Sequence, residues 1–234
     1  MLPPVGDLNA IQARVRQTLD RGVQIDLSTE PCKRFLCRHV NCKIGVAILY
    51  VDIDGSTKMS RALPPAQFAT ILHVFSQEMS LTISECGGYT LKYVGDAVIA
   101  LFPAEYDRQQ ASKNAVDCAK SMREIITKCI NPELVVHGMP GIRIKISIDS
   151  GDVQVVLYGK SLERSHIDIV GSSISMAAKM ISVAHTGQII VGRSLYENLA
   201  SSMRPEDFTR LDLDTSRWSY VDEKSESYRL YLLK

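Results

Sequence analysis

Two short stretches of this chain each place an aspartate where an apolar strand is expected to meet a glycine. Residues 50–57 contain Asp52, and residues 92–100 contain Asp96. A carboxylate at the end of a buried strand is unfavourable unless something pairs with it. If adjacent strands bring the two aspartates together, they form a hard oxygen site for Mg²⁺ or Mn²⁺. Because such sites act on phosphate esters and triphosphates, the pattern predicts an enzyme.

Taken together, these motifs resemble a known family. The sequence Asp-Ile-x-Gly-Ser-Thr, followed about 40 residues later by Lys-x-x-Gly-Asp, resembles the class III nucleotidyl cyclase catalytic domain, the family of adenylyl and guanylyl cyclases. A third block, residues 168–180, is similar to that family's Asp-Ile-Trp-Gly segment. The resemblance extends from about Lys43 to the C-terminus. It predicts residues 44–234 to be a cyclase catalytic domain, preceded by an N-terminal helix and a linker or docking arm at residues 1–43.

The resemblance implies a role for each matching residue. Asp52 and Asp96 would bind two divalent ions, Mg²⁺ or Mn²⁺. Lys92 and Asp168 match the positions that bind the adenine base, whereas guanylyl cyclases typically have glutamate at the Lys92 position. Four residues resemble the family's backbone phosphate cradle: Ile53, Gly55, Ser56 and Thr57.

Two residues depart from the family pattern. Ser175 stands where the family has the asparagine that positions the ribose, and Lys179 stands where it has the arginine that stabilises the transition state. Lysine keeps the charge but lacks the bidentate guanidinium fork. The family's phosphate-contacting lysine near the C-terminus has no clear counterpart, and the candidates are Arg217, Lys224 and Lys234.

The matches predict an adenylate cyclase that converts ATP to 3′,5′-cyclic AMP and pyrophosphate by a two-metal mechanism. In the family, the metal-binding aspartates of one chain face the other substrate-binding positions of a second chain. One chain here carries both sets, so a homodimer with two composite sites is implied.

Several alternatives remain open at this stage. One is a pyrimidine or other nucleotide cyclase, since bacterial pyrimidine cyclases resemble this chain at Lys179 but lack the lysine at the Lys92 position. Another is a non-catalytic nucleotide-binding or dimerisation domain, suggested by Ser175 and Lys179. Asp52 and Asp96 would then be ordinary turn residues, Lys92 an exposed ion-pairing lysine, and Asp168 a helix cap.

Hydrophobic periodicity predicts the elements that position these residues. We expect helices at residues 8–22, 65–86, 107–130, 172–184 and 194–199, and a linker or docking arm at 26–41. We expect strands at residues 44–53, 89–94, 97–102, 142–148, 153–157, 188–191 and 228–233, with turns at Gly95-Asp96 and Ser150-Gly151-Asp152. Helices between antiparallel strand pairs predict an α+β sandwich with a ferredoxin-like core.

Composition excludes some functional classes. The net charge of the 234 residues is +1 and no long basic run occurs, so neither nucleic acid nor an anionic membrane is an expected partner. Because no signal sequence or apolar run of about 18 residues is visible, we expect a cytoplasmic protein without membrane insertion, whose cysteines stay reduced. Cys32, Cys37, His39 and Cys42 lack the usual zinc-ligand spacing and are expected to pack an N-terminal segment.

Overall fold

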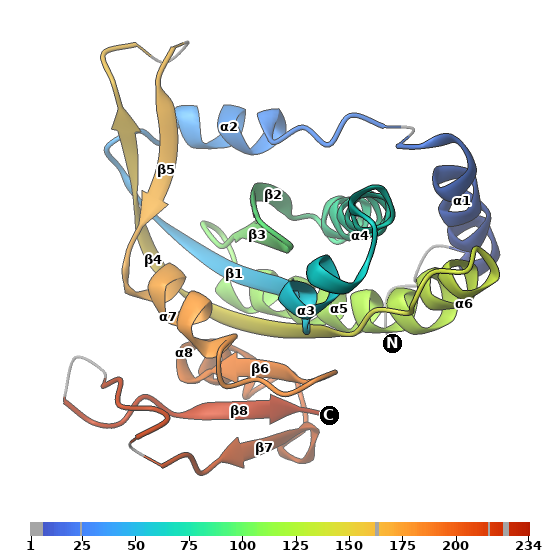
Figure 1. The fold of residues 1–234 in the computed structure, drawn as a ribbon. Coiled ribbons are helices and arrows are strands. Elements are labelled where there is room, and N and C mark those ends of the chain that lie inside the picture. Colours follow the sequence, from blue (N-terminus) through green and yellow to red (C-terminus); the bar gives the residue numbers. More distant parts are fainter. Residues whose placement is uncertain (1–6, 24, 162–163, 215, 222–224) are drawn as a thin grey trace.

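An eight-stranded sheet lies at the centre of the protein, with helices on both of its faces (Figure 1). The computed structural model describes residues 7–23, 25–161, 164–214, 216–221 and 225–234. Its strands are β1 (Lys43–Ile53), β2 (Tyr89–Val94), β3 (Ala97–Pro103), β4 (Ile144–Tyr158), β5 (His166–Val170), β6 (Ile189–Gly192), β7 (Phe208–Leu211) and β8 (Leu230–Leu233). Its α-helices are α1 (Leu8–Arg21), α2 (Glu30–Cys37), α3 (Ser56–Ala62), α4 (Pro65–Glu85), α5 (Arg108–Ile125), α6 (Asn131–Val136), α7 (Ser172–Met180) and α8 (Arg193–Leu199). A π-helical turn, Ile126–Ile130, links α5 to α6.

The first half of the sheet confirms the predicted ferredoxin-like core. The strand order is β2-β3-β1-β4-β6-β8-β7, and β5 pairs with β4 outside this path. The segment β1-α4-β2-β3-α5-β4 therefore forms an antiparallel sheet in the order β4-β1-β3-β2 with two helices between its strands. All paired strands are antiparallel except β4 and β6. This arrangement confirms the predicted α+β class.

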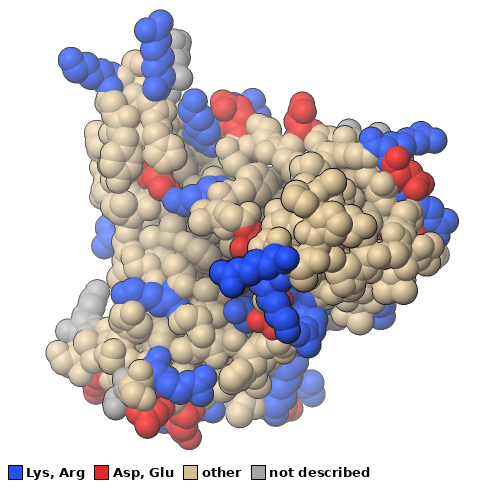
Figure 2. All heavy atoms as spheres, in the orientation of Figure 1, with Lys and Arg blue, Asp and Glu red and all other residues tan. Residues whose placement is uncertain are grey.

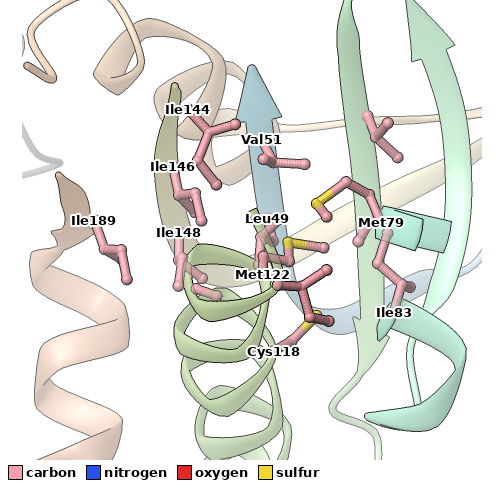
Figure 3. Close-up of a cluster of buried hydrophobic side chains, with 14 of the residues drawn as sticks. Leu49, Val51, Met79, Ile83, Cys118, Met122, Ile144, Ile146, Ile148 and Ile189 are labelled. Atoms are coloured by element: carbon pink, nitrogen blue, oxygen red, sulfur yellow. The ribbon is translucent and has the colours of Figure 1, made fainter. Parts of the chain in front are cut away.

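The main hydrophobic core lies between the sheet and the helices α4 and α5 (Figure 3). In β1, alternate residues face opposite sides of the sheet, as a pleated strand requires. Leu49 and Val51 point into the core with Met79 of α4 and Met122 of α5, whereas Val46 and Ile48 belong to the cluster on the other face. Both faces of β1 are therefore buried, which explains its nearly continuous apolar sequence.

The other face of the sheet is covered by α2 and α7. A Cβ atom built on Gly151 of β4 would lie 3.1 Å from the Ser173 Cβ atom, so glycine allows the start of α7 to pack closely on the strand. Ion pairs attach α1 to α4 and α6. They join Arg14 to Glu78 at 2.7 Å and Arg16 to Glu133 at 2.9 Å.

Several predicted elements are confirmed. Helix α1 occupies the predicted range, and its N-cap Asp7 accepts a hydrogen bond from the backbone N–H of Asn9. The Gly95-Asp96 turn joins β2 to β3 as expected. No helix among the described ranges is both long and apolar enough to cross a membrane.

One prediction about the chain path is wrong. Residues 142–157 do not form a hairpin, because β4 is one strand that pairs with β1 along residues 43–53. The small residues that suggested a turn, Ser150 and Gly151, instead accommodate the helices packed against the strand. The segment at 26–41, predicted to be a linker or a docking arm, contains α2, and its Pro31 lies in the first helical turn, where no backbone N–H is needed. The separation of residues 1–43 from the catalytic domain stays a prediction.

Candidate active site

The two aspartates of the glycine motifs lie side by side at one end of the β1–β3 ladder. Asp52 pairs with Ala97 across that ladder, which places Asp96, the preceding residue, next to Asp52. Burial, reinforced by the neighbouring Asp96 carboxylate, raises the pKa of Asp52 to about 6. Asp96 Oδ2 is buried and has no hydrogen-bond partner among the described residues. A buried oxygen of this kind is unfavourable unless a ligand or cation completes its bonding.

A lysine that the motifs did not indicate lies beside this pair. Lys145 is opposite Asp52 in the β1–β4 ladder. Its Nζ atom is 3.8 Å from Asp52 Oδ2 and 3.6 Å from Asp54 Oδ1. Asp54 accepts a hydrogen bond from the Thr186 hydroxyl, which holds the pKa of Asp54 below its usual value. Asp54 is thus already engaged with the protein, whereas Asp96 Oδ2 has no partner among the described residues.

These oxygen atoms fit a divalent cation. Within the described parts of the chain, no group of three or more His, Cys, Asp and Glu residues could hold a metal ion. Mg²⁺ does not need such a cage, because it commonly binds one or two carboxylates together with waters and substrate phosphates. Two carboxylates with one unpartnered buried oxygen match that requirement. Class III cyclases in general depend on divalent metal ions.

The cysteine cluster near the N-terminus does not match a metal site. Cys32 of α2 is buried in the core, and burial raises the pKa of its thiol to about 12. Cys42 is exposed. A thiol that resists ionisation is a poor metal ligand, because the thiolate is the binding form. The packing interpretation is therefore confirmed for Cys32.

The predicted phosphate cradle begins directly after β1. Gly55 has a φ of 78° and precedes the first residue of α3, Ser56. No side chain caps this helix end, and although the Lys58 N–H donates to the Gly55 carbonyl oxygen, the N–H groups of Ser56 and Thr57 stay available to an anion. Lys58 and Arg61 of α3 are both exposed, and Figure 2 shows Lys and Arg side chains gathered over this part of the molecule.

The two residues predicted to bind the base contact each other directly. Lys92 of β2 and Asp168 of β5 are 76 positions apart in the sequence, and Lys92 Nζ donates to Asp168 Oδ2 at 2.5 Å. A change of register between Thr90 and Lys92 interrupts the β2–β3 ladder. Bulges of this kind redirect side chains next to functional sites. Asp168 Oδ1 also accepts from the Ile169 N–H at 2.9 Å, which fixes its carboxylate plane.

Helix α7 carries Ser175 and Lys179 one turn apart on an exposed face. None of the hydrogen bonds and ion pairs described for the chain joins either residue to the aspartates of β1 and β3 or to the Lys92–Asp168 pair. Lys179 Nζ instead lies over the ring of Tyr220, 3.9 Å from its centre. The structure therefore forms three separate groups of predicted site residues: the carboxylates, the base-binding pair and the α7 face.

The remaining cation candidates do not join these groups. Arg217 and Lys234 are exposed and have no described contact with the predicted site residues, and Lys224 lies outside the described residues. The cation that does reach the carboxylates is Lys145. Its signal in the sequence was the alternation of isoleucine with Arg143 and Lys145, which places both basic side chains on one face of a strand.

A comparison with known families identifies this arrangement. The family model described as the adenylate and guanylate cyclase catalytic domain matches residues 40–228. The chain belongs to this family. The match covers both aspartate motifs, the base-binding pair and α7, and it begins just before β1.

Individual relatives of the cyclase domain differ in the nucleotide they are named for. An adenylate cyclase of Anabaena cylindrica is 29% identical over 83% of this chain and 39% of its own length. A cytidylate cyclase of Escherichia coli is 26% identical over 66% of this chain and 35% of its own length. The solved structure of the guanylyl cyclase Cya2 superposes with a TM-score of 0.70, at 20% identity, over 83% of this chain and 93% of that one. The chain thus spans little more than a third of these two curated relatives.

Proposed function

We propose that this cyclase domain converts ATP to 3′,5′-cyclic AMP and pyrophosphate in a homodimer. The observation that carries the proposal is the direct contact of Lys92 with Asp168. Together the two side chains offer an ammonium donor and a carboxylate acceptor at one point. Adenine presents ring-nitrogen acceptors beside an exocyclic amine donor, which suits this pair. Guanine has a carbonyl oxygen where adenine has the amine, so the carboxylate would face an acceptor.

The aspartates at the end of the β1–β3 ladder would bind the triphosphate end of the substrate through metal ions. Asp52 and Asp96 would hold two divalent ions, and Asp96 Oδ2 is the oxygen that lacks a partner in the described chain. When bound, the ions would lower the pKa of the ribose 3′-hydroxyl and neutralise charge on the phosphates. Lys145 would then be free to contact a phosphate oxygen, and the N–H groups that begin α3 would bind another.

The α7 residues would act at the reacting phosphate. Lys179 would place a positive charge against the developing charge on the phosphoryl oxygens, and Ser175 would donate a hydrogen bond to the ribose. Both residues are exposed and separate from the carboxylates of their own chain. A second copy of the chain that presents its α7 to these carboxylates would complete the site, and twofold symmetry would create two such sites.

A cytidylate cyclase is the second candidate, because a protein of that name is 26% identical to this chain. The two candidates differ at the base. Cytosine is smaller than adenine but also offers a ring-nitrogen acceptor beside an exocyclic amine donor. Bacterial pyrimidine cyclases lack the lysine found here at the Lys92 position, and its presence favours ATP.

The test is product analysis. Purified protein is incubated with Mn²⁺ or Mg²⁺ and each of the four ribonucleoside triphosphates, and the products are identified by mass spectrometry. An Asp96→Asn variant and excess chelator are the matched controls. Cyclic AMP as the main product supports the proposal, and cyclic CMP supports the second candidate. No cyclic product from any nucleotide would mean that the domain binds nucleotide or a partner without catalysis.

A further inference from the structure

The ammonium group of Lys179 has an aromatic partner in its own chain. Its Nζ atom lies 3.9 Å from the centre of the ring of Tyr220, a residue in the segment between β7 and β8. No carboxylate among the described residues lies within ion-pair distance of Lys179. A cation over a ring face is attracted by the negative face of the π system, more weakly than by a carboxylate.

The Tyr220 ring is held in place from behind. Trp218 packs against it at an angle of 65°, with 4.8 Å between ring centres. Trp218 is itself only 4% exposed, and its Nε1 donates to the Tyr228 carbonyl oxygen at 2.7 Å. The Tyr228 N–H in turn donates to the Tyr220 carbonyl oxygen at 2.9 Å. The same cluster includes Met180 of α7, so ring and helix share one packed unit.

We propose that Tyr220 is a positioning residue that orients Lys179 for the reacting phosphate. Lysine is a flexible point charge, whereas arginine has a rigid fork. A fixed ring face beneath the ammonium restricts the lysine chain before substrate binds, and so replaces part of the order that a fork would supply. Because the attraction is weak, phosphate oxygens can take over the ammonium without breaking an ion pair. This inference rests on the proposed function of Lys179.

The contact itself is tested without any activity measurement. Lysines are reductively methylated with ¹³C-formaldehyde, and the signal of Lys179 is assigned by its loss in Lys179→Arg. A methyl group over a ring face is shifted upfield. We expect the shift in the wild type and in Tyr220→Phe, which keeps the ring, and its loss in Tyr220→Leu. An unshifted wild-type signal would overturn the proposal.

Kinetics of the unmodified variants test the positioning role. We expect Tyr220→Leu to lower kcat about fivefold to tenfold with KM within about twofold, because a positioned charge acts mainly in the transition state. Tyr220→Phe should restore most of this loss. Val221→Ala truncates the neighbouring, exposed side chain and is the matched control. If Tyr220→Leu does not fold, as judged by its melting temperature, Tyr220→Met replaces it.

A double-mutant cycle separates positioning from structural damage. In a Lys179→Ala background, Tyr220→Leu should cause no further loss, because the charge that it orients is already absent. An additive loss, or an unchanged kcat in the single variant of an active enzyme, would overturn the positioning role. A wild-type protein that forms no cyclic nucleotide would overturn the proposed function, and the methyl shift would still decide whether Tyr220 holds Lys179.

Discussion

Two aspartate sites of this cyclase domain look alike in sequence but differ in structure. Asp52 and Asp149 each follow a strand-like stretch rich in β-branched residues and precede a glycine within three residues. Burial raises the pKa of both, to about 6 for Asp52 and about 7 for Asp149. Asp149 accepts hydrogen bonds from the Tyr228 hydroxyl and from the Ser150 N–H, each at 2.9 Å. Asp52 instead faces a second carboxylate, Asp96, one oxygen of which has no partner in the described chain.

The difference shows that burial alone does not identify a functional carboxylate. Asp149 is nearly inaccessible, at 1% exposure, and the chain itself completes its bonding. It also borders a hollow of about 600 Å³ between β4, α7 and α8, so the presence of a cavity does not separate the two sites either. What separates them is an unsatisfied oxygen next to a like charge. A fold keeps such an arrangement when a cation completes it.

The largest expected effect tests this distinction directly. Asp96→Asn should reduce cyclase activity about a thousandfold, because the loss of an anionic ligand removes several kcal/mol of metal-dependent stabilisation. Asp149→Asn, a chemically identical change at the other site, should leave activity within about threefold. Both are measured as kcat/KM for cyclic nucleotide formation at saturating Mn²⁺, with melting temperatures to confirm folding. Equal losses of activity in the two variants would show that the unsatisfied oxygen of Asp96 does not distinguish a functional carboxylate from a structural one.

The second prediction concerns stability against pH at Asp149. Its pKa is about 7 in the folded state, against 3.8 for the model group. Between these two pKa values the folded chain keeps a proton on Asp149 that the unfolded chain has lost. The protonated carboxyl therefore contributes fully to the free energy of unfolding below about pH 4, and this contribution is lost as pH rises toward 7. In Asp149→Asn the free energy of unfolding should therefore fall about 2–4 kcal/mol less over this pH range than in the wild type, since one pKa unit corresponds to 1.36 kcal/mol. Urea unfolding at pH 4.5 and pH 7.5 measures it.

The control for this experiment is Asp152→Asn. Asp152 is a neighbour on the same strand, and its partners Lys43 and Arg108 are solvent-exposed to a large extent. Exposed pairs contribute little, so its stability profile should follow the wild type. If Asp149→Asn also declines with pH as the wild type does, the Asp149 carboxyl is not protonated in the folded protein.

Local patterns were sufficient for the parts of the site that lie close together in the sequence. The Gly95-Asp96 turn was predictable because a two-residue connection between apolar runs has few other solutions. The continuous strand β4 was not, because Ser150 and Gly151 are small for two different reasons: turns favour small residues, and so do close helix contacts. Only the packing of Ser173 against Gly151 shows which reason applies.

Contacts between distant segments could not be read from periodicity. Lys92 and Asp168 are 76 positions apart, with α5 and β4 between them, so their contact depends on the whole sheet order. Here the family resemblance supplied what local patterns lacked. It did not indicate Tyr220, because that residue lies in a segment without a motif. Strand alternation could have indicated Lys145, but a basic residue on a strand is usually solvent-exposed.

The third prediction tests the rule drawn from Asp149 on another carboxylate, Asp168. Asp168 is well satisfied by Lys92 and the Ile169 N–H, yet we assign it a functional role. Exchanging the pair, with Lys92→Glu and Asp168→Ser, should lower the ATP-to-GTP ratio of kcat/KM at least about tenfold. A site built to bond one base rejects another that leaves its polar groups unpaired. Lys113→Glu, on the exposed side of α5, is the charge-matched control. An unchanged ratio would place Asp168 with Asp149, as a structural carboxylate.

The smallest expected effect asks whether the carboxylates and α7 of different chains work together. Asp96→Ala should be inactive alone, and Lys179→Ala should keep only a small residual activity. Random exchange of equal amounts gives half heterodimers, and in each of these one of two sites has a complete residue set. The mixture should therefore recover about a quarter of wild-type activity. Lys179→Ala mixed with Ser175→Ala is the control that should recover nothing, since both changes fall on α7. Recovery there, or none in the first mixture despite proven exchange, would show that each chain forms its site alone.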